Sequence, residues 1–214
     1  FIILIIFFFL IERKSEIISS IDELIPLEVT QYLEESNTLN TNWVYAEGLP
    51  GYFQYNQFNF SSYIITNYLL YKICPIKIDK LIFFRYLNAL YQFISFILLF
   101  LILKEIKIPI AFILISLLLF SISPLLVQDS IYARPESYFV LITTLFIYLN
   151  LRLITINRKG VTLSFISLIF GLALACKISF IVLGLLPALI VFRTNAINFY
   201  NIFLCTTFIL IGFI

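Results

Sequence analysis

The chain has 214 residues, of which 62% are hydrophobic and 12% are charged, and its formal net charge is +2. Soluble domains carry about 45–50% apolar and about 25% charged residues, so this composition excludes a soluble enzyme, a disordered segment and a disulfide-rich scaffold. The mean hydropathy of +1.05 instead indicates a membrane protein with several spans. The chain contains no histidine, which excludes histidine-ligated metal sites and histidine general bases.

The apolar runs predict the order of the membrane spans. Residues 1–11 supply about half of a span, because a complete one needs roughly 20 apolar residues. Residues 12–82 then form a long, largely polar outer loop. The later apolar runs cover residues 83–103, 108–126, 138–153, 161–192 and 196–214. Because the first and last runs are incomplete, we expect a single membrane domain, residues 1–214, that is truncated at both ends.

The run 161–192 is too long for one straight span. As a single helix it would measure about 48 Å at 1.5 Å per residue, whereas the apolar core of a bilayer is about 30 Å thick. Lys177 lies at its middle, where a charge that faces lipid is costly. The sequence therefore predicts two short helices that meet near Lys177. This lysine is either functional or a residue that only marks the turn.

Charge divides the loops into two sets. The first set contains one acidic residue, Glu105, and six basic residues: Lys104, Lys107, Arg152, Arg158, Lys159 and Arg193. The second set comprises residues 12–82, the turn 127–137 and Lys177, and it carries eleven of the twelve acidic residues. The positive-inside rule assigns the first set to the cytoplasm. The second set then faces outward, and we expect a multi-pass protein of the plasma (inner) membrane.

The outer loop shows a helical pattern that begins near Asp22. One face of this helix is apolar, and Glu28, Glu34 and Glu35 fall mostly on the other face. The apolar positions are Ile21, Ile25, Val29, Tyr32 and Leu33. Such a helix is expected to lie along the membrane interface. Residues 52–71 interleave aromatic and polar side chains, a composition that also suits the interface and sugar or lipid head groups.

Asp22 and Glu23 are the first candidates for chemistry. A carboxylate that faces outward beside the membrane can deprotonate an acceptor hydroxyl or amine. The alternative is that Asp22 is a helix N-cap and Glu23 a favourable acid in the first turn. The two interpretations are compatible, because a cap also fixes a carboxylate in place.

Three cations are candidates for binding an anion. Arg134 precedes Pro135, which can open the next helix, and a helix N-terminus with an arginine beside it favours a phosphate. The alternative is an interfacial arginine that pairs with Glu136 or reaches to lipid head groups. Lys177 is expected on the same side of the membrane. Arg85, at the start of the span 83–103, is either an interfacial anchor or a weaker phosphate ligand.

Four segments together resemble a known family. They are SIDELIPLEVTQYLEE, FRYLNALYQFISFILLFLILKE, SISPLLVQDSIYARPESYFVLITTLFIYLNLR and GLALACKISF, and they extend over about residues 18–193. In this order the segments resemble the GT-C membrane glycosyltransferases, in particular the protein mannosyltransferase and ArnT-like group often called RgtA/B/C/D-like. The stretch FQYNQFNFSSYI lacks the prolines typical of that group at this place, which leaves the acceptor and the subfamily open.

The resemblance implies an all-α, polytopic transmembrane bundle of the GT-C type, with interfacial helices on the outer loop. It implies an inverting glycosyltransferase that moves a sugar from a polyisoprenyl-phosphate donor to a lipid, glycan or protein acceptor. By this resemblance Asp22 is the base and Glu23 assists in positioning the acceptor or the base, while Arg134, Lys177 and, less strongly, Arg85 bind the donor phosphate. No cofactor and no nucleic acid are expected, no metal ligands are assigned, and metal dependence is left open.

Two other functions remain open at this stage. A transporter or lipid flippase needs polar residues in the middle of several spans and broken helices. Apart from Lys177, the sequence predicts almost no such residues in the spans, so this alternative is the weaker one. A structural or assembly protein of the membrane is the third possibility. It predicts that Asp22, Arg134 and Lys177 do not converge in space.

Overall fold

The computed structural model describes residues 21–39, 41, 43–44, 54–55, 60–74, 78–155, 159–187 and 199–213. This part of the chain is helical apart from one short antiparallel pairing between Trp43–Val44 (β1) and Gln54–Tyr55 (β2). The all-α fold class is confirmed at this level. The predicted half-span 1–11 lies outside the described residues, as do Arg158 and Arg193.

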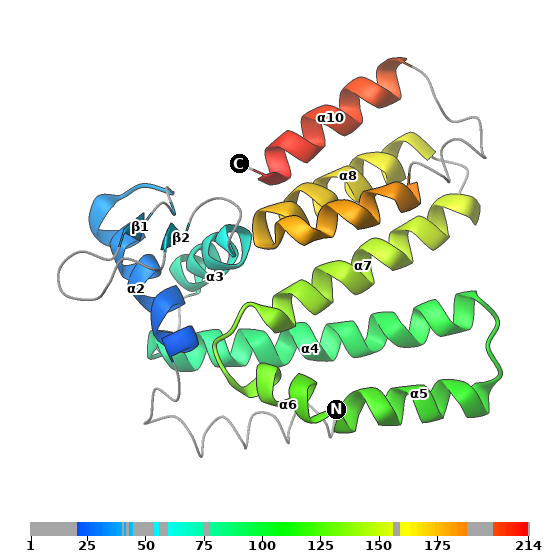
Figure 1. Cartoon of the computed structure of the whole chain (residues 1–214), viewed down its shortest axis with the longest axis horizontal. Coiled ribbons are helices and arrows are strands. Elements are labelled where there is room, and N and C mark those ends of the chain that lie inside the picture. The colour runs from blue at the N-terminus through cyan, green and yellow to red at the C-terminus, as the bar shows by residue number, and fades with distance from the viewer. Residues whose placement is uncertain are drawn as a thin grey trace.

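Two long helices, α4 (Lys80–Glu105) and α7 (Glu136–Thr155), lie side by side at the centre of the molecule (Figure 1). Both are long and apolar enough to cross a membrane, as the sequence predicts for residues 83–103 and 138–153. The start of α4 is fixed by Asp79, whose Oδ1 accepts hydrogen bonds from the backbone N–H groups of Leu81 (2.9 Å) and Ile82 (3.3 Å). This N-cap satisfies donors that have no partner within the helix.

The predicted span 108–126 is broken. Helix α5 (Ile110–Ile122) ends at Ser123, and α6 (Pro124–Ile131) leaves at an angle of 56°. Pro124 explains the break, because proline has no N–H to continue the helix but fits well at the first position of a new one. If the bent pair counts as one span, the described residues contain three candidate spans. Large apolar side chains of α5 remain exposed, among them Phe112, Leu114, Ile115, Leu118 and Leu119, as expected for a surface that faces lipid.

The break at Lys177 is confirmed. Helix α8 (Lys159–Cys176) ends directly before Lys177, and the chain reverses beside it into the 3₁₀-helix η1 (Ile178–Gly184), as Figure 1 shows. The second piece begins as a 3₁₀-helix and becomes α-helical only at residues 185–187. Within the described residues, each piece is shorter than a membrane span.

Helix α10 (Phe199–Phe213) packs closely on α8 because both carry glycine at the crossing. A Cβ atom added to Gly171 would collide with the carbonyl oxygen of Ile209 and would lie 3.0 Å from the backbone of Gly212. A Cβ on Gly212 would in turn collide with the carbonyl oxygen of Leu168. Small residues at such a crossing let two apolar helices approach to backbone contact, which is a common device in membranes.

Two further helices, α2 (Ile21–Ser36) and α3 (Ser61–Ile73), cover one end of the molecule. The predicted apolar face of α2 is confirmed at Ile25, Val29 and Leu33, which are buried, whereas Tyr32 lies at its edge with 37% exposure. The hydroxyls of Ser61 and Ser62 at the start of α3 donate to the carbonyls of Ala175 and Leu172. These carbonyls belong to the last turn of α8, so α3 is tied to the end of that helix.

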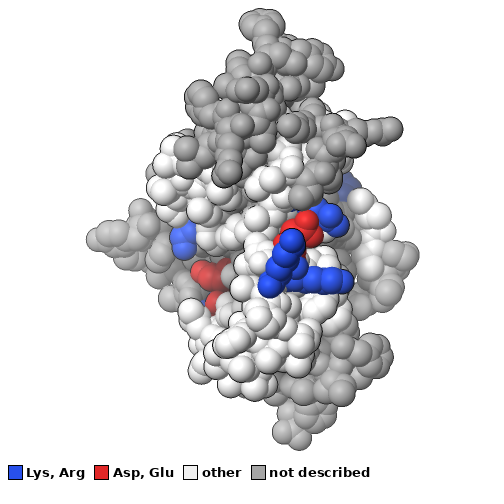
Figure 2. All heavy atoms as spheres, turned by 90° about the vertical axis from the view of Figure 1, so that its right-hand side faces the viewer, with Lys and Arg blue, Asp and Glu red and all other residues white. Residues whose placement is uncertain are grey.

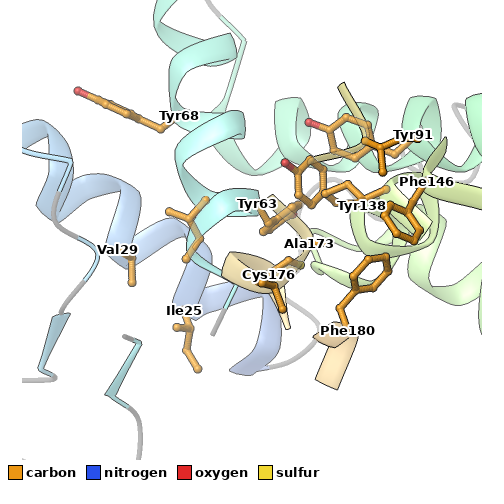
Figure 3. Close-up of a cluster of buried hydrophobic side chains, with 14 of the residues drawn as sticks. Ile25, Val29, Tyr63, Tyr68, Tyr91, Tyr138, Phe146, Ala173, Cys176 and Phe180 are labelled. Carbon is orange, nitrogen blue, oxygen red and sulfur yellow. The ribbon is translucent and has the colours of Figure 1, made fainter. Parts of the chain in front are cut away.

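The main core lies where α2, α3, α7, α8 and η1 meet. Its buried members include Tyr63, Tyr138, Phe146 and Phe180, and Figure 3 shows their rings close together. The ring centroids of Phe146 and Phe180 are 5.1 Å apart in an edge-to-face arrangement, and those of Tyr63 and Tyr138 are 5.8 Å apart. Aromatic pairs at such separations add to the free energy of burial.

The two ends of the molecule differ in charge as the sequence predicts. The basic end carries the C-termini of α4 and α7, where Arg152 Nη1 lies 3.7 Å from Glu105 Oε1. Figure 2 looks onto this end and shows basic side chains gathered around an acidic one. The opposite end, called here the α2 end, carries α2, α3, the turn between α6 and α7, and the junction of α8 with η1 (Figure 1). Lys177 stands at that junction. Which end faces the cytoplasm stays a prediction.

Candidate functional site

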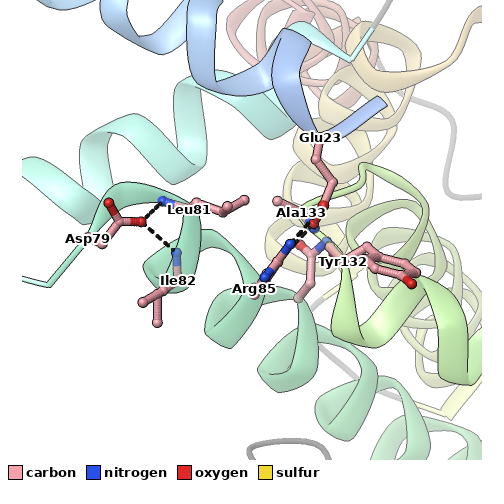
Figure 4. Close-up of polar contacts among 8 residues, drawn as sticks. Glu23, Asp79, Leu81, Ile82, Arg85, Tyr132 and Ala133 are labelled. Carbon is pink, nitrogen blue, oxygen red and sulfur yellow. Dashed lines mark hydrogen bonds and ion pairs between the residues drawn. The ribbon is translucent and has the colours of Figure 1, made fainter. Parts of the chain in front are cut away.

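The best-defined polar feature of the α2 end is a buried ion pair between Glu23 of α2 and Arg85 of α4 (Figure 4). Arg85 Nε donates to Glu23 Oε1 at 2.9 Å, and Arg85 Nη2 donates to Glu23 Oε2 at 2.8 Å. Both side chains have 0% exposure. This is the two-pronged geometry in which a guanidinium matches a carboxylate best.

A third segment joins this pair. The backbone N–H of Ala133, in the turn between α6 and α7, donates to Glu23 Oε1 at 2.8 Å. Glu23 therefore connects three elements that are far apart in sequence. A buried pair of this kind is costly to break, because removing one partner leaves the other charge without compensation.

This geometry changes the roles predicted for two residues. Both oxygens of Glu23 are engaged and buried, so of the two roles predicted for it, direct contact with an acceptor is excluded in this position. Positioning of the base stays a prediction. Arg85 is not an interfacial anchor, and its buried guanidinium does not reach a phosphate at the surface. The sequence could not reveal the pairing, because the two residues are 62 positions apart.

Asn88 lies three residues after Arg85 on α4 and binds the turn between α6 and α7. Its Nδ2 donates to the carbonyl oxygens of Tyr132 (2.6 Å) and Arg134 (2.5 Å). The backbone N–H of Arg134 donates to the carbonyl of Tyr132 at 2.9 Å. Sequence reasoning missed Asn88, although an asparagine three positions after an arginine in an apolar helix was a readable signal.

Arg134 stands on this turn, largely buried with 19% side-chain exposure. Its Nη1 lies 4.0 Å from Asp129 Oδ1, and its guanidinium carbon lies 5.4 Å from the centroid of the Tyr132 ring. Besides this long contact with Asp129, Arg134 interacts electrostatically with Glu136, the partner that the sequence offered as an alternative. An arginine held over an aromatic face keeps its donors in a fixed direction.

Lys177 comes from the break between α8 and η1, and its side chain is exposed. Its Nζ lies 5.6 Å from the centroid of the Phe139 ring, in the first turn of α7. Glu136, three residues before Phe139, is close enough to Lys177, Arg134 and Asp129 to interact electrostatically with each of them. The structure therefore gathers Arg134 and Lys177 around the start of α7.

Asp22 is described only by its backbone, which lies in the first turn of α2. Its neighbour Glu23 contacts Ala133, the residue before Arg134. Because consecutive Cα atoms are about 3.8 Å apart, the backbone of Asp22 lies beside the turn that carries Arg134. The side chain lies outside the described residues, so its distance from the two cations, and its N-cap role, stay predictions.

Glu28 of α2 is a partly buried carboxyl with an altered pKa. Burial raises the pKa of its carboxyl above the ordinary value. Its Oε2 is buried and finds no hydrogen-bond partner within the described residues. Removal from water disfavours the charged form of a carboxyl, which is why the pKa rises.

The sequence prediction that the spans hold almost no polar residues besides Lys177 was wrong. Helix α4 buries Arg85, Asn88, Gln92 and Ser95, which follow each other at intervals of three or four residues and so share one face. Asn150 of α7 is buried as well. Mean hydropathy is an average over all residues of an apolar segment, so it does not reveal polar residues that line one face of a helix.

Two further observations bear on function. Within the described part of the chain, no group of three or more His, Cys, Asp or Glu side chains is placed to hold a metal ion. No family model, curated protein or solved structure matches the chain.

Proposed function

We propose that the chain is part of a membrane glycosyltransferase of the GT-C type, which transfers a sugar from a polyisoprenyl-phosphate donor to an acceptor outside the cytoplasm. The observation that supports this most is the convergence of Arg134 and Lys177, from distant segments, around the start of α7. They lie at the α2 end, opposite the basic end, where the positive-inside rule puts the outer face.

In this proposal the two cations bind the phosphate that leaves the sugar. Negative charge develops on the leaving phosphate in the transition state, and cations fixed in a partly dry site stabilise that charge. Asp22 is the base that takes the proton from the acceptor hydroxyl or amine as its oxygen or nitrogen attacks the sugar carbon. Direct attack inverts the configuration at that carbon. The polyisoprenyl tail stays in the bilayer beside the apolar surface of the helices.

Glu23 and Arg85 serve this site indirectly. They hold the first turn of α2, which carries Asp22, against the turn that carries Arg134. The multi-pass topology, the plasma-membrane location and the identity of the acceptor as a lipid, glycan or protein belong to the same proposal.

The experiment is a transfer assay on the membrane-embedded protein, with radiolabelled polyprenyl-phosphoryl sugars as donors. Asp22→Asn is expected to lower the rate by about 10²–10⁴-fold, the usual contribution of a general base. Glu35→Gln, an exposed carboxylate on the same helix, is the matched control and should leave the rate unchanged. Sugar transfer by Asp22→Asn at the unmodified rate would reject the base assignment.

A transporter or lipid flippase is the second candidate, and the structure gives it more support than the sequence did. The polar stripe of α4 is buried within a candidate span, and the pair α5 and α6 is bent at Ser123. Both features occur in transporters. A vesicle assay separates the two functions: transbilayer movement of a fluorescent lipid phosphate, without formation of a glycosylated product, supports transport.

A further inference from the structure

The basic end of the molecule gathers three cations that the proposed function does not use. Lys104 lies in the last turn of α4, Lys107 follows the C-cap of that helix, and Arg152 lies in the last turn of α7. Both lysines are exposed, and neither forms an ion pair within the part of the chain that the structure describes. Figure 2 shows basic side chains gathered on this face around an acidic one.

Arg152 is fixed in place but still reaches the surface. Its Nε donates to the Tyr148 hydroxyl at 3.1 Å, and its guanidinium carbon lies 5.6 Å from the centroid of the Tyr148 ring. Its Nη1 lies 3.7 Å from Oε1 of Glu105, the residue after Lys104. The Arg152 side chain nevertheless has 42% exposure. Glu105 balances only one of the three positive charges, so this surface favours an anion.

The end of α4 holds Lys107 in a backbone conformation that favours glycine. The N–H of Ile108 donates to the carbonyl of Leu103 at 3.1 Å, and the N–H of Lys107 donates to the carbonyl of Lys104 at 3.0 Å. These two bonds form a Schellman motif, in which the residue after the C-cap is left-handed and is usually glycine. Lys107 occupies that position with a φ of 61°. A side chain is disfavoured there, because its Cβ approaches the following carbonyl oxygen.

The helix dipole does not explain a lysine at this position. The dipole favours a cation in the last turn of a helix, and Lys104 already supplies one there. Lys107 adds its charge beyond the helix at the expense of a more favourable backbone residue. A residue held in a sparsely populated conformation is a reason to look for a ligand.

An exposed apolar face of α4 leads directly to these cations. Leu90, Ile97 and Lys104 follow each other at intervals of seven residues, so they lie on one face of the helix. Leu90 has 39% and Ile97 has 41% exposure, and Ile106, between the two lysines, has 48%. An apolar face that ends in cations matches a phospholipid, whose acyl chain needs apolar contacts and whose phosphate needs positive charge.

We propose that Lys104, Lys107 and Arg152 bind the headgroup of an anionic phospholipid, and that one acyl chain lies along the exposed apolar face of α4. Charge complementarity selects the headgroup, because a zwitterionic lipid brings a positive group that these cations repel. Basic side chains beside a membrane surface attract anionic lipids in this way. The proposal does not depend on sugar transfer, since the site lies at the end opposite the α2 end.

The test is a lipid titration of the full purified chain in detergent micelles. Native mass spectrometry gives the dissociation constant of the first bound molecule of phosphatidylglycerol, which is anionic, or of phosphatidylcholine, which is zwitterionic. The unmodified chain should bind phosphatidylglycerol more tightly. Lys104→Gln should weaken that binding about fivefold, which corresponds to about 1 kcal/mol for one basic residue at an anionic surface. Binding of phosphatidylcholine should not change.

Lys72→Gln is the matched control. Lys72 is an exposed lysine in the last turn of α3, at the α2 end, so this variant removes the same charge far from the proposed site. It should bind phosphatidylglycerol like the unmodified chain. If it weakens the binding as much as Lys104→Gln, the lipid responds to net charge alone, and the inference is overturned.

Lys107→Gly separates the charge of Lys107 from its place in the backbone. Glycine adopts a positive φ without a Cβ contact, so the variant should melt at a higher temperature in lipid-free micelles. It should nevertheless bind phosphatidylglycerol about fivefold more weakly, by the same effect of one basic residue. Unchanged binding in both Lys104→Gln and Lys107→Gly would overturn the inference.

A competition experiment identifies the source of the phosphate. Glycerol phosphate carries the same anionic group without acyl chains, so in excess it should not displace phosphatidylglycerol from the unmodified chain. Displacement would show that the cations bind a soluble phosphate ester, and it would refute the lipid site.

Discussion

Replacing Glu23 with glutamine removes one charge of the buried pair that Glu23 forms with Arg85. The glutamine keeps the shape of the side chain and an oxygen that can accept from the N–H of Ala133. The guanidinium of Arg85, however, remains at 0% exposure and loses the carboxylate charge with which it pairs. Breaking a buried ion pair in this way costs about 3–5 kcal/mol. Glu23→Gln should therefore lower the free energy of unfolding by about that amount.

The double variant Glu23→Leu/Arg85→Met provides the comparison that identifies the cause. It removes both charges, so the desolvation of two ions no longer opposes folding, and such replacements are often neutral or stabilising. The remaining penalty is the N–H of Ala133, which loses its acceptor at a cost of about 1–3 kcal/mol. The double variant should thus be less destabilised than Glu23→Gln alone.

The measurement is reversible unfolding in mixed micelles, with the single variants Glu23→Gln, Glu23→Leu and Arg85→Met and the double variant Glu23→Leu/Arg85→Met in parallel. Destabilisations that simply add up would refute the reasoning, because additivity means that the two charges do not interact in the folded protein. A coupling close to zero would also remove the argument that Glu23 positions the first turn of α2.

Three further changes test other parts of the structure. Gly171→Leu should separate α8 from α10, because a Cβ there meets the backbone of α10, and cysteine cross-linking between the two helices should become inefficient. Asp79→Ala removes the N-cap of α4 and should cost about 1 kcal/mol in unfolding experiments. Burial raises the pKa of Glu28, so the folded protein holds this proton more tightly than the unfolded chain and its stability falls as pH rises through the folded pKa. Glu28→Gln should consequently be more stable than the unmodified chain at neutral pH, and the difference should vanish below the ordinary glutamate pKa of about 4.3; an advantage that persists at acidic pH would contradict this.

The sequence predicted those features that depend on length and local chemistry. The spans around α4 and α7 follow from long apolar runs, and the break at Lys177 follows from a run too long for one crossing with a charge at its middle. The break between α5 and α6 was missed although Pro124 is visible in the sequence. A proline near the end of an apolar run is compatible with both a continuous kinked span and two helices, and the choice depends on the packing of α6 against α4.

The pairings across the fold could not be predicted. Several cations and carboxylates were expected on the same side of the membrane, and nothing local shows that Glu23 selects Arg85 rather than Arg134. Burial determines that Glu23 pairs with Arg85, because Arg85 points into the contact between α4 and α2. A charge is tolerated there only with a bidentate partner. Asn88 was missed for a related reason: its role depends on two carbonyl oxygens of a distant turn.

The cations Arg85, Arg134 and Lys177 differ in their surroundings, and this difference supports the proposed function. The charge of Arg85 is matched within the fold, so it adds little to the attraction of an outside anion. Arg134 lies 4.0 Å from Asp129, and Lys177 is exposed beside an aromatic ring. In the proposed function these two cations bind the donor phosphate, which accepts two parallel hydrogen bonds from a guanidinium. The buried pair joins α2 to α4 and to the turn before α7, and so holds the first turn of α2 beside the turn that carries Arg134.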